Sequence, residues 1–160
     1  MRRTRRLLLL TILGFLVAAS QVYAQGNKEL IAQGQYLFAN AGGCACHTVP
    51  EETYHTGGRA FPIPFGTVFS TNITQDKETG LGEWSDQQIH EAMNTGRRPD
   101  GSRLLPVMPY EAYSGMAQQD LRALVAYMRT LKPVKKATPD LKTWVPFVRS
   151  VGVPAYLRFF

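Results

Sequence analysis

The sequence predicts a mainly α-helical domain in which three or more short helices and long loops wrap around one large apolar group. Three segments repeat apolar residues at helical spacing. Between the first two lies a long stretch, residues 48–84, rich in Gly, Pro, Thr and Asn, in which no convincing strand is expected. Three short helices make a thin core for about 110 residues. We therefore expect the chain to fold around something that it binds.

Composition and charge narrow the possible classes of protein. The chain has 160 residues, 44% of them hydrophobic and 19% charged, which is typical of a globular protein. Two cysteines are too few for a disulfide-stapled scaffold. The formal charge is +6, but four of the 18 basic residues lie in residues 2–6, and without the first 24 residues the charge falls to +2. No basic stripe remains, so no nucleic-acid partner is expected.

The N-terminus has the order of a secretory signal. Basic residues come first, an apolar run follows from Leu7 to Ala19, and Val22-Tyr23-Ala24 places small residues where a signal peptidase cuts. The alternative is an uncleaved membrane anchor, but the apolar run is shorter than the ~20 residues that span a bilayer. We expect export to the periplasm by the general secretory route and cleavage after about Ala24.

The first helix is expected over residues 27–41. Apolar or small residues such as Leu30, Gly34 and Phe38 recur at helical spacing, and Asn27 is a candidate cap. Gly42-Gly43 is expected to end the helix.

Two further helices follow the long loop region. The second is expected to start at Ser85, with Gln88 completing a capping box and Gly96 as the stop. The third spans about Gln118 to Leu131. Its apolar stripe predicts the main core contact of the domain, and Pro133 closes it.

Both cysteines and one of the three histidines lie within the four residues Cys44-Ala45-Cys46-His47. The nearest chemical template is Cys-x-x-Cys-His, the attachment site of c-type haem, in which two thiols bond the haem and the histidine binds iron. Here the spacer is one residue short. In a helical turn, residues two apart point to different sides, so Cys46-His47 keeps the essential half and Cys44 does not necessarily reach a second vinyl group.

A haem iron in an electron-transfer protein needs a second ligand, usually methionine. Met108 lies in a proline-flanked loop just before the last predicted helix, a setting that suits a rigidly presented thioether. The other mature methionines are expected to pack in the core: Met93, Met116 and Met128. The other histidines are rival ligands, of which His90 is expected to be a solvated helix residue and His55 lies in a loop.

Two other kinds of site remain open on these residues. Cys44, Cys46 and His47 could hold copper or zinc together with Met108 or His55, and such soft donors suit Cu(I). The other alternative is an oxidoreductase whose haem iron is five-coordinate because Met108 is displaced from it. No nucleophile–base pair or phosphate-binding glycine loop is found.

A series of short motifs runs in order along residues 28–133. They are Gly34-Gln35-Tyr36-Leu37-Phe38, Gly43-Cys44, Cys46-His47-Thr48, Pro64 to Thr74, Asp76 to Gly80, Trp84-Ser85-Asp86, Gly96 to Gly101, Met108-Pro109-Tyr110, Asp120-Leu121 and Leu124 to Tyr127. In these motifs the chain resembles class I cytochrome c, and more narrowly the haem domains of the cytochrome c subunits of bacterial alcohol and aldehyde dehydrogenases.

The resemblance implies one covalent haem c, attached through Cys46 and through Cys44, with His47 and Met108 as axial ligands. With both ligands in place, iron has no open position, so the resemblance implies an electron carrier and not an enzyme. It also implies that the first and last helices cross near Gly34 and Tyr127. Trp84 and Arg59 are candidates near the haem carboxylates.

The domain organisation expected from these observations has three parts: a signal peptide at residues 1–24, a monohaem cytochrome c domain at 25–134 and a C-terminal extension at 135–160. The aromatic-rich extension is expected either to pack back on the haem domain as a strap or to dock on a partner or membrane surface. Expected redox partners are a dehydrogenase, a terminal oxidase or another cytochrome. A free-standing monohaem shuttle fits the chain equally well.

Overall fold

A computed structural model of the chain describes residue 21 and residues 25–144, apart from 42, 51 and 53. The predicted export signal and its cleavage site lie outside these residues. In chain order the elements are a helix at residues 25–40, α2 (Gly43–Cys46), β1 (Ala60–Ile63), β2 (Gly66–Phe69), α3 (Asp86–Thr95), α4 (Tyr110–Ser114), α5 (Gln118–Met128) and β3 (Lys142–Thr143).

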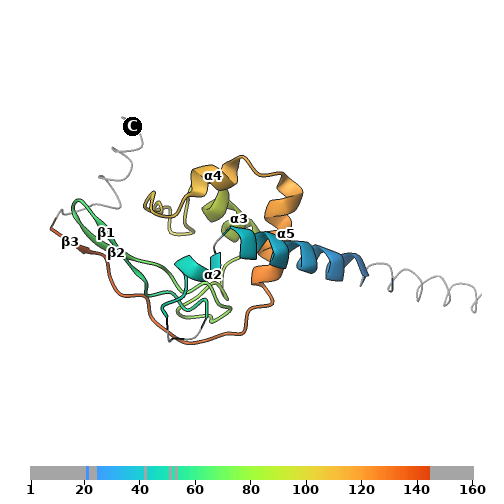
Figure 1. Cartoon of the computed structure of the whole chain (residues 1–160), viewed down its shortest axis with the longest axis horizontal. Coiled ribbons are helices and arrows are strands. Elements are labelled where there is room, and N and C mark those ends of the chain that lie inside the picture. Colours follow the sequence, from blue (N-terminus) through green and yellow to red (C-terminus); the bar gives the residue numbers. More distant parts are fainter. Residues whose placement is uncertain (1–20, 22–24, 42, 51, 53, 145–160) are drawn as a thin grey trace, which may run out of the picture.

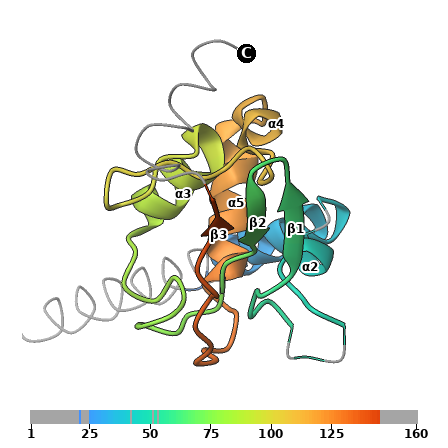
Figure 2. The same ribbon diagram turned by 90° about the vertical axis from the view of Figure 1, so that its left-hand side faces the viewer.

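The helices gather at one end of the molecule and the small sheet at the other (Figure 1). The helix at residues 25–40 crosses α5, and α3 packs on both α4 and α5. The sheet is antiparallel in the order β1-β2-β3 (Figure 2). Pro62 lies in β1, an edge strand, where a residue without an N–H is tolerated.

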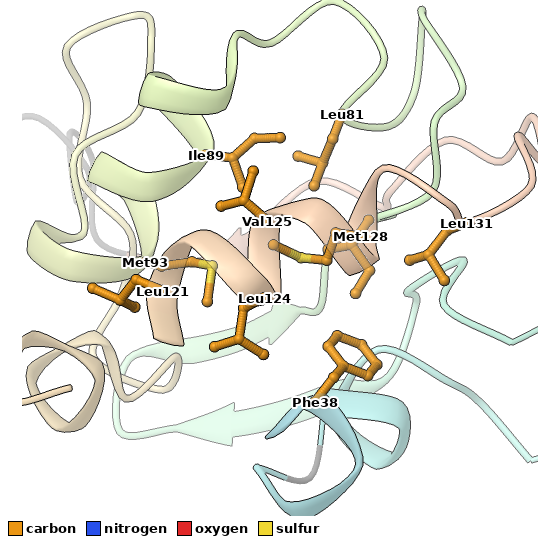
Figure 3. Close-up of a cluster of buried hydrophobic side chains, with 10 residues drawn as sticks. Phe38, Leu81, Ile89, Met93, Leu121, Leu124, Val125, Met128 and Leu131 are labelled. Carbon is orange, nitrogen blue, oxygen red and sulfur yellow. The ribbon is translucent and has the colours of Figure 1, made fainter. Parts of the chain in front are cut away.

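The apolar stripe of α5 forms the centre of the core (Figure 3). Leu121 and Leu124 are almost fully buried. Phe38 reaches this stripe from the first helix and Ile89 from α3, so three segments far apart in sequence share one core. The predicted role of the last helix is therefore confirmed.

The predicted ends of α3 are also confirmed. The Ser85 side chain accepts a hydrogen bond from the Gln88 backbone N–H, and the Gln88 side chain accepts one from the Ser85 N–H. At the other end Gly96 adopts φ 70°, a left-handed conformation that favours glycine. A Cβ at Gly96 would also lie 2.7 Å from the Tyr110 ring, so the same residue lets α4 pack beneath α3.

Several predicted boundaries were wrong. Residues 25 and 26 are already helical, so Asn27 is inside the first helix and does not cap it. The last helix ends at Met128, before Leu131. The short helices α2 and α4 were not predicted, and β1 and β2 form a hairpin where no strand was expected. Each strand has only four residues, too few for alternation to be visible in the sequence.

The segment that follows α5 packs back on the domain as a strap. Asn72 donates through Nδ2 to the carbonyl oxygens of Val134, 2.8 Å away, and Lys136. Farther along, β3 pairs with β2. Residues 134–143 therefore pack back on the domain, whereas residues 145–160, which hold most of the aromatic residues of the extension, lie outside the described part. None of the helices in the described part is both long and apolar enough to cross a membrane.

Candidate functional site

An apolar cavity lies between the helices and the sheet. Its walls come from several elements, among them β2 through Val68, α3 through Ile89 and Met93, and α5 through Met128. Cys46, His47 and Met108 line the same cavity, so the structure brings together three of the four predicted site residues. The side chain of the fourth predicted residue, Cys44, is not among those that the structure describes.

His47 follows directly on α2 and is held by one specific hydrogen bond. Its Nδ1 donates to the carbonyl oxygen of Thr71, 2.7 Å away. Because a carbonyl oxygen can only accept, this contact places the proton of the neutral ring on Nδ1 and leaves the Nε2 lone pair free to bind a metal. Burial lowers the pKa of His47, while the hydrogen bond to Thr71 acts in the opposite direction and the charge of His55 lowers it further. The ring is thus kept in its neutral, ligand-competent form.

The loop after His47 closes tightly on the segment after β2 that supplies Thr71. The backbone N–H of Gly57 donates to the His47 carbonyl oxygen at 2.8 Å. Gly57 adopts φ +70°, and a Cβ there would lie 2.4 Å from the Thr71 carbonyl carbon. Only glycine permits this approach. It fixes the backbone on both sides of the His47–Thr71 contact.

Met108 is presented by a short turn between α3 and α4, just before α4 begins at Tyr110. Its N–H donates to the Leu105 carbonyl oxygen at 3.0 Å, and its own carbonyl accepts from the Tyr110 N–H at 2.8 Å. Leu105 is buried and anchors the turn. Met108 is half-buried and packs against the main core cluster while lining the cavity. The proline-flanked turn therefore places the Met108 side chain at the cavity.

Cys46 ends α2 and its thiol is free and exposed at the cavity. Tyr113 of α4 lines the same cavity. Burial raises the pKa of Tyr113, and the charge of Cys46 raises it further. Because Val107 and Pro109 also line the cavity and are exposed, the mouth opens to solvent at the side where Cys46 and the Met108 loop meet.

The rival ligands are placed elsewhere. His55 packs edge-on against Phe38, with ring centroids 5.4 Å apart, and His90 bonds through Nε2 to Gln118 at 2.9 Å. Among the described residues that line the cavity, His47 is the one histidine. Met93 and Met128 line it from α3 and α5 as buried core residues, and Met116 packs on the core.

Trp84 and Arg59, the two residues expected near the haem carboxylates, lie in different places. Trp84 lines the cavity. Arg59 is not among its lining residues; its guanidinium donates to the Ala45 carbonyl oxygen at 2.7 Å and lies over the Phe61 ring. Arg98 lines the cavity and was not predicted to do so. In the sequence it is one of two adjacent arginines, Arg97 and Arg98, and nothing distinguishes it from the other.

The residues present fit an iron porphyrin. The cavity offers apolar walls, an imidazole with its Nε2 lone pair free, a thioether and, at the mouth, a thiol. Among the described side chains, which exclude that of Cys44, no group of three or more His, Cys, Asp or Glu comes together as a metal site. Iron held by a porphyrin needs only axial donors from the protein, which is what His47 and Met108 can supply.

A family model described as cytochrome c matches residues 31–132, and the chain belongs to the cytochrome c family. Members of this family are electron carriers that bind haem c covalently. The predicted family, fold class and role as a carrier rather than an enzyme are therefore confirmed.

The chain is also similar to cytochrome subunits of bacterial dehydrogenases. It is 40% identical over 135 residues to the gluconate 2-dehydrogenase cytochrome c subunit of Pantoea cypripedii, covering 83% of this chain and 30% of that protein. It is 38% identical over 130 residues to the fructose dehydrogenase cytochrome subunit of Gluconobacter japonicus, covering 80% of this chain and 26% of that protein. It is 40% identical over 130 residues to the cytochrome c subunit of the alcohol dehydrogenase (quinone) of Gluconacetobacter polyoxogenes, covering 80% of this chain and 27% of that protein. The chain thus spans less than a third of the length of these curated relatives.

Proposed function

We propose that this chain is a periplasmic electron carrier with one covalent haem c, ligated by His47 and Met108, that accepts electrons from a dehydrogenase. The observation that carries the proposal is the meeting of His47 and Met108, from opposite halves of the sequence, in one apolar cavity. When bound, the haem supplies reversible one-electron exchange between Fe(III) and Fe(II).

The ligand residues have distinct roles. His47 presents Nε2 because its Nδ1–H is bound to the Thr71 carbonyl. Met108 presents a thioether from a turn that is hydrogen-bonded on both sides. Two ligands leave iron without an open position, which suits electron transfer and excludes substrate from the metal.

Cys46 is proposed to form the thioether bond, because its thiol lies at the cavity and is adjacent in sequence to His47. The spacing of Cys44 is one residue short of the usual motif. Positions two apart in a helix do not share a face, so attachment through Cys46 alone is the simplest arrangement for α2.

The partner and compartment follow from separate observations. The N-terminal signal pattern supports export, as does the covalent haem that the family implies. A dehydrogenase donor is supported by the relatives, which are named as cytochrome subunits of gluconate, fructose and alcohol dehydrogenases. Electrons would enter at the open mouth beside Cys46, Val107 and Pro109, where apolar atoms are exposed.

The ligand assignment is tested with the full chain matured in cells that attach haem c. Ferric protein with methionine ligation shows a far-red sulfur-to-iron charge-transfer band. We expect Met108→Leu to abolish this band and to lower the reduction potential, while Met116→Leu keeps both as in the wild type. Loss of the band in Met116→Leu, or its retention in Met108→Leu, contradicts the assignment.

A further inference from the structure

The peptide group whose carbonyl holds His47 makes a second contact at its opposite end. The carbonyl oxygen of Thr71 and the N–H of Asn72 are the two polar ends of one planar trans peptide unit, so they point in opposite directions. The carbonyl oxygen accepts from Nδ1 of His47 at 2.7 Å, and the N–H donates to Oγ1 of Thr138 at 3.2 Å. One peptide group therefore connects the candidate iron ligand with the strap.

The backbone on both sides of this peptide is fixed by further hydrogen bonds. The loop that precedes β1 holds it at two points: the Gly58 N–H donates to the Ser70 carbonyl oxygen at 2.8 Å, and the Ile73 N–H donates to the His55 carbonyl oxygen at 3.0 Å. The strap holds it through the Asn72 side chain, which donates to two carbonyl oxygens of the strap. The peptide is thus clamped between the loop and the strap, and its orientation is set from both.

The contact between Thr138 and the Asn72 N–H lies in a shielded place. Asn72 is buried and Thr138 is half-buried. Hydrogen bonds that follow one another in such surroundings polarise each other, so each bond strengthens the next. None of the described strap residues lines the apolar cavity. An influence of Thr138 on the iron site therefore passes through other residues, and the shared peptide offers a path of two hydrogen bonds.

We propose that Thr138 of the strap is a positioning residue for the iron ligand His47, acting through the peptide between Thr71 and Asn72. The inference rests on the proposed function and deepens it. Donation of the Asn72 N–H to a hydroxyl polarises the peptide and makes the Thr71 carbonyl oxygen a stronger acceptor. A stronger acceptor for the Nδ1 proton fixes the imidazole ring and raises the basicity of the histidine as a ligand. The strap thus tunes the iron site from outside the cavity.

Removal of the Thr138 hydroxyl has a predictable sign. Without this acceptor the peptide is less polarised, and the Thr71 carbonyl oxygen holds the Nδ1 proton of His47 more weakly. A less basic histidine stabilises ferric haem less, because ferric haem carries one more positive charge than ferrous haem. Thr138→Val keeps the branched shape and loses the hydroxyl, so it should raise the reduction potential.

The test compares four holoproteins matured as full chains: the wild type, Thr138→Val, Thr138→Ser and Thr143→Val. Thr138→Ser keeps a hydroxyl at the position, and Thr143→Val removes a strap hydroxyl that donates elsewhere, to the Phe65 carbonyl oxygen at 2.8 Å. We expect a higher reduction potential in Thr138→Val only. NMR of the reduced protein should show the Nδ1 proton of His47 shifted upfield in that variant. The Asn72 amide should exchange with solvent about fivefold faster there, the factor that corresponds to one ordinary hydrogen bond.

Two results overturn the proposal. The first is a Thr138→Val variant whose potential and Nδ1 resonance are both those of the wild type. The second is an equal change in Thr143→Val, which would show that loosening the strap at any point has the same effect.

A measurement on the wild type covers the case in which Thr138→Val yields no holoprotein. In the reduced holoprotein the Asn72 amide proton should show a nuclear Overhauser effect to the Cβ proton of Thr138, and its absence overturns the proposal. Failure of the proposed function is distinguishable, since the wild type itself would then contain no covalent haem.

Discussion

Gly34 of the first helix lies directly against the backbone of Ala123 in α5. A Cβ built at Gly34 would lie 1.8 Å from the Ala123 carbonyl oxygen and 2.9 Å from the Cβ of Tyr127. No side chain fits at that distance, so the two helices cross at a point that only glycine allows. This contact confirms the predicted crossing, and it sets the position of the first helix, which leads into α2 and His47.

Gly34→Ala should therefore force the helices apart. Because the obstacle is backbone, overpacking should lower the free energy of unfolding by about 3 kcal/mol or more. Gly26→Ala is the control: residue 26 is helical and nothing lies within 4 Å of its Cβ position. There alanine should leave stability unchanged or raise it by up to about 1 kcal/mol. The free energy of unfolding of both variants is measured by denaturant titration, and equal values would refute the close crossing.

Asn72 ties the strap to the domain. It is 1% exposed, and its side chain donates to Val134 and to Thr79 while accepting from the Thr74 N–H at 2.9 Å. Asn72→Ala removes these buried hydrogen bonds, leaves the Thr74 N–H without the Asn72 acceptor, and should cost about 2 kcal/mol or more. Asn40→Ala removes an exposed asparagine with one bond, to the Tyr36 carbonyl, and should change stability by less than about 0.5 kcal/mol.

Proteolysis gives an independent readout of the same contact. We expect the strap of Asn72→Ala to be cut faster than that of Asn40→Ala under native conditions, because its opening needs less free energy. Identical cleavage rates would show that Asn72 does not hold the strap.

Arg129 holds the loop that carries Trp84. Its guanidinium donates to the Asp86 carboxylate, to the Gln75 side chain at 2.8 Å and to the carbonyl oxygens of Leu81 and Trp84. Lysine cannot match this fork of donors. Arg129→Lys should lower the free energy of unfolding by about 1–3 kcal/mol. Arg122→Lys, at an exposed position on α5, which Arg129 follows directly, should change it by under about 0.5 kcal/mol. Thermal unfolding of the two holoproteins compares them, and equal losses would contradict the role of Arg129.

Asp76 gives the stability a defined dependence on pH. The Thr79 hydroxyl and the Thr79 backbone N–H both donate to its carboxylate and lower its pKa. A folded-state pKa below the unfolded value of about 3.9 contributes stability that is complete above that value and is lost as pH falls towards the depressed pKa. Asp76→Asn should flatten this acid limb, measured as unfolding free energy against pH. Parallel curves for variant and wild type would show that the contact contributes nothing.

The sequence predicts most of the fold because its strongest signals are local. The capping box at Ser85 and the apolar stripe of α5 depend on residues three or four apart, and both are present. The hairpin of β1 and β2 is missed because four-residue strands, one of them containing Pro62, show no alternation.

Cys46, His47 and Met108, which meet at the cavity, could be singled out from the sequence because the identity of each side chain already indicates its chemistry. Thr71 could not be found in this way, because it acts through its backbone carbonyl and lies 24 residues from His47. Arg98 was missed for a related reason. Its place at the cavity depends on how the chain folds, and in sequence it does not differ from its exposed neighbour Arg97.

The central claim is that Cys46 carries a covalent haem between His47 and Met108. The most direct measurement is the alkaline pyridine haemochrome spectrum of the denatured full chain after haem maturation, for the wild type, Cys44→Ala and Cys46→Ala. We predict an α band in the wild type that lies to the red of a two-thioether standard, the same band in Cys44→Ala, and no covalent haem in Cys46→Ala. A band at the position of the standard would contradict attachment through Cys46 alone. Absence of covalent haem from the wild type, under conditions that mature a control cytochrome, would contradict the account as a whole.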